Sequence, residues 1–358
     1  MGKKVGIVTI YDLNPNYGNR LQNLAVQTVL ENMGLDVATY SFEKENFGLW
    51  GTVKYILEVL SGFRLARDNA YWKGMPPKIF SFRKFNRRYI KTERIHSIYE
   101  LSQKDFYVVG SDQTWNATWY INDDFKKNMY LLTFADPSKR VCFAPSFGVD
   151  NLAEKMKPWF QKHLNGFPYL SVREEAGAKI IKELTGRDAT VMIDPTLMLT
   201  ADDWRVFEKK PKKAKEGYVL TYFLSPKCNK AKIQLKGIDE GRKVYALMDP
   251  EDDVTRASDP CEFLWLFDNA DIILTDSYHA CIFSFLFNKP FLVFDRKWDG
   301  CNMNSRLETL LKKFDLERKY AGSGLKNDIW EHDYSLGHKQ LVIERQKAMS
   351  FLKKAFGD

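Results

Sequence analysis

His279 has a residue type and a position that suit acid–base chemistry. It stands between two apolar runs, in the stretch DIILTDSYHACIFSFLF. Asp276 or Ser277 is a natural N-cap, which places His279 in the first turn of the next helix. There the helix macrodipole disfavours the imidazolium and keeps the ring neutral, unless an anion lies beside it. Such a histidine can give a proton to an anionic substrate. A histidine that is only hydrogen-bonded in a packed turn is the alternative.

Polar residues also follow the other predicted strands. In open α/β sheets, ligands bind beyond the carboxyl ends of the strands, where loops and helix N-termini meet. The candidates at these ends are Gly18, Asn19, Gln22, Ser111, Asp112, Gln113, Ser146, Arg173, Asp276 and Ser277. Turns and caps are polar in any protein, but an arginine and a histidine at helix starts on separate strands distinguish this set. Asp112 is either a carboxylate that orients or deprotonates a hydroxyl group, or an aspartate that caps its loop.

Apolar strands and helical segments alternate along the chain, and this alternation must position the candidate residues. KKVGIVTIYD, the loop and helix after it, and DVATYSF form one βαβ unit, whose crossover should be right-handed. Residues 47–100 predict two or three inserted helices, and another helix is expected near 227–240. The alternation predicts parallel sheets that are covered by helices on both faces.

The chain length favours two domains. At 358 residues the chain exceeds the size at which a single core keeps growing. The lysine-rich stretch 197–216 has no strand pattern and is typical of a linker. We therefore predict an N-terminal α/β lobe at 1–198 and a C-terminal α/β lobe at 199–334, both Rossmann-like, with a central cleft. The last helix, about 335–355, is expected to pack back on the first lobe.

The composition excludes several classes of protein. The chain is 44% hydrophobic and 14% aromatic, which is wrong for a disordered chain. No apolar stretch reaches the roughly 18 residues that a membrane-spanning helix needs, and the N-terminal apolar run is too short for a signal peptide. The five cysteines are far apart and form no cluster with histidine, so neither a disulfide framework nor a zinc site is indicated. We expect a cytoplasmic protein without a metal.

The net charge of +8 requires an explanation. Basic residues concentrate in RKFNRRYIKTER (83–94), in KKPKKAK (209–215) and in the C-terminal tail. No nucleic-acid fingerprint accompanies them. Attraction to an anionic substrate or to the inner face of a membrane is one interpretation, and ordinary solvated faces are the other. For 83–94 the interspersed Phe85, Tyr89 and Ile90 suit a peripheral membrane contact.

Seven motifs, taken together and in order, resemble the polysaccharide pyruvyl transferase family. They are YGNRLQ, VVGSDQTWN, APSFG, LSVREE, IDPTLML, DIILTDSYHACIFSFLFNKPFLVF and NSRLETLL, within about residues 5–315. The resemblance implies a GT-B-like fold and transfer of pyruvate from phosphoenolpyruvate to a hexose, as a ketal, in a surface polysaccharide such as a capsule or exopolysaccharide, or in its lipid-linked precursor. It implies no cofactor and no metal, since phosphoenolpyruvate is the donor substrate.

The resemblance also implies roles for single residues. Arg173 in SVRE matches an arginine that faces phosphoenolpyruvate, His279 in TDSYHA matches an acid/base histidine, and Arg306 in NSRL matches a second anion-binding arginine. We expect both arginines to converge from opposite lobes on one anion pocket beside His279. Some family members have an arginine where this chain has Ser277. Either Arg306 supplies that charge, or the donor is held differently, or the donor is another compound.

Two other functions compete with this one. A glycosyltransferase with the same two lobes would use a nucleotide-sugar, but its usual glycine-rich loop and late glutamate are not evident in the sequence. A non-catalytic carbohydrate-binding protein could keep the fold alone. The sequence leaves the acceptor sugar open, and with it whether the acceptor is free, nucleotide-bound or lipid-linked.

Overall fold

The computed structural model describes most of the chain. The described residues are 2–11, 15–41, 75–225, 238, 241–298, 301–302, 305–323 and 329–357. The first part of the predicted insertion at 47–100 and nearly all of the predicted helix near 227–240 lie outside these residues.

A five-stranded sheet of order β3-β2-β1-β4-β5 forms the first lobe. Its strands are β1 (Lys4–Val8), β2 (Asp36–Ser41), β3 (Thr92–Arg94), β4 (Phe106–Val109) and β5 (Arg140–Cys142). Every neighbouring pair is parallel, which is the strand order of a Rossmann fold. Val5 and Ile7 of β1 pack in one core cluster and Val8 in another. Both faces of the sheet are therefore buried, which explains the continuous apolar run in the sequence.

The other elements of this lobe are helices and two short strands. They are α1 (Tyr17–Asn32), α4 (Met75–Tyr89), α5 (Asp124–Tyr130), α6 (Lys157–Leu164) and α7 (Glu175–Thr185), with the parallel pair β6 (Ser171–Val172) and β7 (Thr190–Val191). Phe85 and Ile90 are buried in the core, so the apolar part of the predicted membrane contact at 83–94 is wrong. The helix packs Phe82 and Phe85 inward and exposes the basic residues Lys84, Arg87 and Arg88, together with Phe80, which is 61% exposed.

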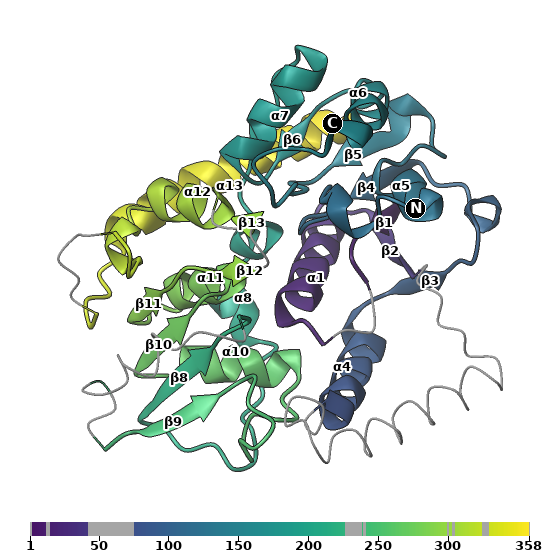
Figure 1. Cartoon of the computed structure of the whole chain (residues 1–358). Coiled ribbons are helices and arrows are strands. Elements are labelled where there is room, and N and C mark those ends of the chain that lie inside the picture. Colours follow the sequence, from purple (N-terminus) through teal and green to yellow (C-terminus); the bar gives the residue numbers. More distant parts are fainter. Residues whose placement is uncertain are drawn as a thin grey trace.

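A four-stranded parallel sheet of order β11-β10-β8-β9 forms the second lobe. Its strands are β8 (Tyr218–Tyr222), β9 (Lys243–Ala246), β10 (Ile272–Thr275) and β11 (Phe291–Val293). The helices are α8 (Ala201–Arg205), α10 (Pro260–Asp268), α11 (Tyr278–Leu286) and α12 (Ser305–Lys313), and a small antiparallel ribbon joins β12 (Lys297–Trp298) to β13 (Cys301–Asn302). Two parallel α/β sheets in separate lobes (Figure 1) confirm the predicted GT-B-like arrangement of two Rossmann-like lobes.

The stretch predicted as a linker, 197–216, contains α8, which begins with a capping box between Thr200 and Asp203. Trp204 of this helix is fully buried, and its Nε1 donates to the carbonyl of Thr196 at 3.0 Å. The composition of the stretch hides this anchor, because a single tryptophan among lysines leaves no periodic pattern. The boundary between residues 198 and 199 stays a prediction.

The long helix α13 (Ser335–Phe356) contacts both lobes. Near its start, the Tyr334 hydroxyl donates to the carbonyl of Lys289 in the second lobe at 2.9 Å. At its end, the carbonyl of Phe356 accepts from Lys3 at 2.9 Å, and its ring packs on Phe106. Figure 1 shows α13, in yellow, extending from beside α12 towards β5 and β6. Within the described part of the chain, no helix combines the length and the apolar character that crossing a membrane requires.

Candidate active site

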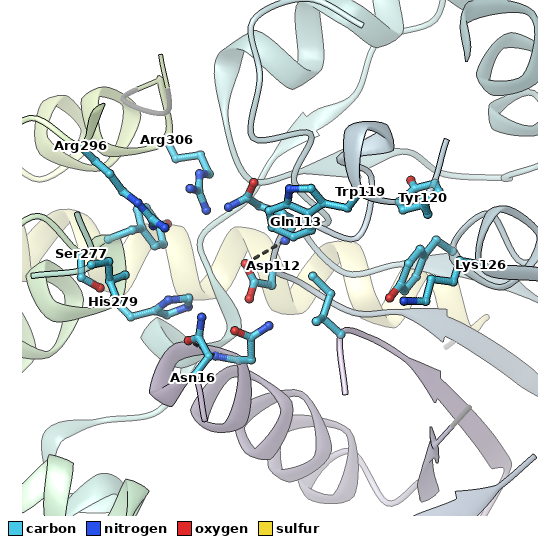
Figure 2. A pocket seen from close by; sticks show the side chains of 15 residues that line it. Asn16, Asp112, Gln113, Trp119, Tyr120, Lys126, Ser277, His279, Arg296 and Arg306 are labelled. Carbon is cyan, nitrogen blue, oxygen red and sulfur yellow. Dashed lines mark hydrogen bonds between the residues drawn. The ribbon is translucent and has the colours of Figure 1, made fainter. Parts of the chain in front are cut away.

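A cavity of about 390 Å³ lies between the two lobes. About half of its lining comes from residues just after four strands: Ile10 after β1, Asp112 and Gln113 after β4, Leu224 after β8, and Ser277 to His279 after β10. The carboxyl ends of both parallel sheets therefore face one space, where an α/β fold places its ligand. Figure 2 shows side chains of both lobes pointing towards this space.

His279 lies in the first turn of α11, as the sequence predicts. Ser277 occupies the N-cap position, but its side chain makes no capping hydrogen bond. Asp276 is not the cap either, because its carboxylate accepts the backbone N–H groups of Leu224 at 2.7 Å and Ser225 at 2.9 Å. Asp276 thus fixes the loop after β8, and Ser277 and His279 line the cavity.

The His279 ring is held between the start of α1 and a buried carboxylate. Its Nε2 is 3.6 Å from Oδ2 of Asp194, within the range of an ion pair but longer than a hydrogen bond. On the other side, a Cβ built on Gly18 would stand 2.1 Å from Nδ1 of His279. Only a glycine leaves room for the ring here, so Gly18 acts through the space it leaves and is not among the described residues that line the cavity.

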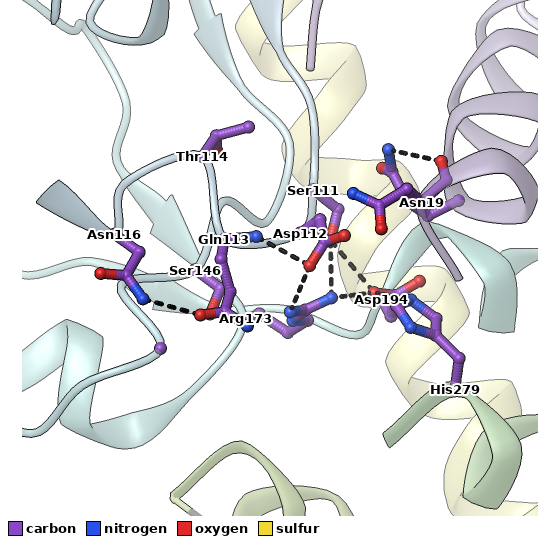
Figure 3. A network of polar contacts seen from close by, with 12 residues as sticks. Asn19, Ser111, Asp112, Gln113, Thr114, Asn116, Ser146, Arg173, Asp194 and His279 are labelled. Atoms are coloured by element: carbon purple, nitrogen blue, oxygen red, sulfur yellow. Dashed lines mark hydrogen bonds and ion pairs between the residues drawn. The ribbon is translucent and has the colours of Figure 1, made fainter. Parts of the chain in front are cut away.

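Asp194 is the centre of a buried polar network (Figure 3). Its Oδ2 accepts from Nη1 of Arg173 at 2.5 Å and from the Ser111 hydroxyl at 3.1 Å. Its Oδ1 accepts from the backbone N–H and hydroxyl of Thr196 at 2.9 and 2.7 Å. Burial alone would raise the pKa of Asp194, but His279 and Arg173 hold it well below its usual range. Asp194 is therefore a carboxylate that links the two predicted site residues.

Arg173 is buried and committed to protein partners. Besides Asp194, its Nη2 is 3.5 Å from Oδ1 of Asp112, and its guanidinium lies 4.6 Å from the centre of the Tyr278 ring. Burial opposes the charge, but Asp194 above all raises the pKa of Arg173 above its usual value. Arg173 is not among the described residues that line the cavity. It stands behind the cavity wall and connects the carboxylates of Asp112 and Asp194.

Arg306 approaches the same tyrosine from the second lobe. Its guanidinium lies 5.8 Å from the centre of the Tyr278 ring, and its side chain lines the cavity. Burial, with the like charge of Arg173, lowers the pKa of Arg306 to about 10. Arg296, which follows β11, adds a further guanidinium to the lining. The two predicted arginines thus meet at Tyr278, but only Arg306 reaches the cavity.

Asp112 combines features of both of its predicted roles. Its φ of 67° lies in the left-handed region, which a non-glycine residue adopts at a cost and which recurs at functional sites. One carboxylate oxygen accepts the backbone N–H of Gln113 at 2.8 Å, as a loop-capping aspartate would. The same side chain pairs with Arg173 and lines the cavity. Asp112 therefore presents a carboxylate to the cavity.

The other predicted residues divide into two groups. Asn19 and Gln113 line the cavity. Gln22 and Ser146 instead hold the backbone around it: Gln22 donates to the Thr9 hydroxyl at 2.7 Å, and the Ser146 hydroxyl donates to Glu174 at 3.0 Å. The Ser111 hydroxyl likewise lies in the supporting network, since it donates to the carboxylate of Asp194.

Several lining residues had no role in the sequence-based prediction. They are Ile10, Asn16, Trp119, Tyr120, Lys126, Tyr130, Leu224, Tyr278 and Arg296. Asn16 was detectable, since its side chain caps α1 by accepting the backbone N–H of Asn19. Trp119, Tyr120, Lys126 and Tyr130 lie away from strand ends and motifs, so spacing gave no signal for them. Among the described residues, no group of three or more His, Cys, Asp or Glu side chains gathers as a metal site would require.

The family model described as polysaccharide pyruvyl transferase matches residues 16–297. No curated protein matches the chain.

Three similar solved structures are enzymes of nucleotide-sugars or sugars. The UDP-GlcNAc 2-epimerase of Methanocaldococcus jannaschii is 14% identical, with a TM-score of 0.40, over 97% of this chain and 99% of that one. The UDP-GlcNAc 2-epimerase of Neisseria meningitidis is 10% identical, with a TM-score of 0.40, over 98% and 100%. An E. coli heptosyltransferase is 10% identical, with a TM-score of 0.31, over 83% and 90%.

Proposed function

The chain belongs to the polysaccharide pyruvyl transferase family, and on this premise we propose that it transfers pyruvate from phosphoenolpyruvate to two hydroxyl groups of a hexose, forming a ketal. The reaction would serve the synthesis of a surface polysaccharide or its lipid-linked precursor. The observation that carries the proposal is the common cavity of His279, Arg306 and Asp112, which unites an acid, a cation and a carboxylate.

The cationic lining suits phosphoenolpyruvate as donor. This substrate has a carboxylate and a phosphate on one small skeleton, and guanidinium groups bind both in a bidentate manner. Arg306 and Arg296 both line the cavity. The N-terminus of α11 also opens there, and its N–H groups and dipole favour an anion. Arg306 is the proposed source of the positive charge that some family members place at the position of Ser277.

The reaction needs a general acid. Protonation of the methylene carbon C3 turns the enol carbon C2 into an oxocarbenium-like centre. One acceptor hydroxyl attacks C2 and releases its proton, and a second hydroxyl then replaces the phosphate. One hydroxyl proton balances the proton on C3, the other leaves with the phosphate as hydrogen phosphate, and no electron is gained or lost. Such acid catalysis typically contributes about 10²–10⁴-fold.

His279 is the proposed acid. Its Nε2 lies 3.6 Å from a carboxylate oxygen of Asp194, and its ring lines the cavity in which the donor would bind. Asp112 is the proposed acceptor of the hydroxyl proton, because its carboxylate lines the same cavity. These roles need no metal and no cofactor other than the donor.

Phosphate release tests the proposal. The purified chain is incubated with phosphoenolpyruvate and a panel of hexose acceptors, and separately with nucleotide-sugars. We expect acceptor-dependent phosphate release and a product heavier than the acceptor by one ketal-bound pyruvate. Nucleotide release alone would instead show a glycosyltransferase. Glycan binding without either product would show a non-catalytic carbohydrate-binding protein.

A further inference from the structure

The cavity has two chemically different ends (Figure 2). The anion end contains His279, Arg296 and Arg306 of the second lobe. The aromatic end contains Trp119, Tyr120, Lys126 and Tyr130 of the first lobe. Figure 2 shows Asp112 between the two ends. The proposed donor chemistry uses the anion end and Asp112, and leaves the aromatic end without a role.

Internal hydrogen bonds fix the aromatic end in place. The indole N–H of Trp115, a fully buried residue, donates to the carbonyl of Tyr130 at 3.0 Å and so ties the loop after β4 to the end of α5. The Tyr120 hydroxyl donates to the carbonyl of Thr114 at 2.9 Å. The Asn116 side chain donates to Gln113 at 2.7 Å. A surface built in this way is formed before any ligand arrives, which lowers the cost of binding.

Trp119 is unlike its neighbour Trp115. It lies in the 3-10 helix η2 (Ala117–Trp119) and is 55% exposed, whereas Trp115 is completely buried. The indole therefore contributes little to the core, and it lines the cavity instead. A wide, flat, apolar face beside polar groups suits a sugar ring, which covers it with its C–H groups while its hydroxyls reach the polar side.

Lys126 adds a positive charge to the same end. An ammonium group is a compact point charge with three donors that adapts to different anions. We propose that the aromatic end is the acceptor subsite, in which a hexose stacks on Trp119 and Lys126 binds an anionic group of that sugar, either a phosphoryl group or a carboxylate. This inference rests on the proposed function, since it assigns the donor to the anion end.

The placement of Asp112 agrees with this assignment. A hexose on Trp119 turns its hydroxyls towards Asp112, and a donor among His279, Arg296 and Arg306 presents its reacting carbon from the other side. The cavity volume of about 390 Å³ is within the rough range for small-molecule sites, and it accommodates a small donor and one sugar ring.

Binding measurements by calorimetry test the subsite. The probes are glucose, galactose and mannose 1-phosphates, the matched methyl hexosides, glucuronate and galacturonate, inorganic phosphate, and phosphoenolpyruvate. The variants are Trp119→Ala, Trp119→Phe and Lys126→Ala. The controls are Trp330→Ala and Lys155→Ala, a half-exposed tryptophan and an exposed lysine that do not line the cavity. Thermal unfolding of each variant identifies any loss of folding.

We expect at least one anionic hexose to bind the unchanged protein. Trp119→Ala weakens its binding about tenfold or more, and Trp119→Phe by less than about threefold. Lys126→Ala weakens the binding of the anionic hexoses about tenfold but leaves the binding of the methyl hexosides unchanged. The phosphate and uronate probes show which anion Lys126 prefers. Both controls bind as the unchanged protein does.

Other outcomes overturn the subsite and remain separable from failure of the proposed function. The subsite would be refuted if no anionic hexose bound the unchanged protein. It would also be refuted if Trp119→Ala bound an anionic hexose as tightly as the unchanged protein does. A third refuting outcome is that Lys126→Ala weakens the binding of inorganic phosphate but not of any hexose. If phosphoenolpyruvate binds in those cases, the proposed function stands. If phosphoenolpyruvate does not bind but anionic hexoses bind through Trp119 and Lys126, the donor assignment fails and the subsite stands.

Discussion

The two ends of the cavity are held in place by different forces. At the anion end, His279 of the second lobe depends on Asp194 and Arg173 of the first lobe, so buried charges couple the lobes. At the aromatic end, Trp119 stands on a loop whose hydrogen bonds stay within one lobe. A change at the anion end therefore disturbs the fold as well as the chemistry. At the aromatic end Tyr120 and Tyr130 are buried in the core, whereas the exposed Trp119 can change with little effect on the fold.

The largest expected effect is on turnover. His279→Ala removes the proposed acid, so kcat falls by about 10²–10⁴-fold, with a much smaller change in KM for phosphoenolpyruvate. The measurement is acceptor-dependent phosphate release. Asn269→Ala, on an unrelated turn after α10, is the control. Full turnover by His279→Ala would show that this histidine is only a packed turn residue. The anion end would then differ from the aromatic end in stability but not in catalysis.

Asp194→Asn tests how much the buried network behind the anion end contributes to stability. It leaves the buried Arg173 charge without its closest partner, which costs roughly 3–5 kcal/mol of stability. The pKa of Asp194 is lower in the folded than in the unfolded state. Its contribution to the free energy of unfolding is therefore complete above the pKa of an unfolded aspartate, about 3.9, and is lost as the pH falls towards the pKa of the folded state. In urea unfolding, the gap between the variant and the unchanged protein should therefore be widest near neutral pH and narrow below about pH 4.

An exposed carboxylate provides the matched control. Asp188, whose side chain is 90% exposed and pairs with Lys182, should lose less than about 0.5 kcal/mol on change to Asn. A gap for Asp194→Asn that is small, or that does not depend on pH, would show that the buried network contributes little to the stability of the fold.

The two arginines should separate binding from stability. Arg306→Ala should weaken phosphoenolpyruvate binding by roughly 1.5–3 kcal/mol, since a charge-assisted contact is lost. Its effect on stability should be smaller than that of Arg173→Ala, which strands the carboxylate of Asp194. Calorimetry with phosphoenolpyruvate measures the change in binding, and urea unfolding measures the change in stability. Equal stability losses, or unchanged binding by Arg306→Ala, would contradict the division between a lining arginine and a structural one.

The smallest effect concerns the membrane. If the acceptor is lipid-linked, the first lobe should meet the membrane, and α4 of that lobe exposes Arg87 and Arg88. Each basic residue near an anionic surface contributes about 1 kcal/mol. Sedimentation with phosphatidylserine vesicles should decrease as salt increases, and the double change of Arg87 and Arg88 to alanine should reduce it further. The same double change at Lys212 and Lys213 is the control. Absence of binding at low salt would end the idea.

Much of the fold could be predicted, because strands buried on both faces leave continuous apolar runs in the sequence. The place of His279 followed from an N-cap position alone. The role of Asp194 did not, because a carboxylate after a strand has the same local pattern as a turn residue. Arg173 lies beside Asp194 because β6 pairs with β7, but His279 comes near only when the two lobes meet. The sequence also could not show that Trp115 is buried and Trp119 exposed, since loop shape decides this.

The chain passes between the lobes twice, once before α8 and again along α13. Arg345 of α13 joins the two crossings by donating to the carbonyls of Leu197 and Leu199, both at 2.7 Å. A body attached to another at two points can rotate about the line through them, but it cannot twist freely. Any opening of the cavity should therefore be a hinge rotation of one lobe against the other about this single axis. A single break in the first crossing would leave the two pieces joined by α13, so they should still migrate as one particle under native conditions.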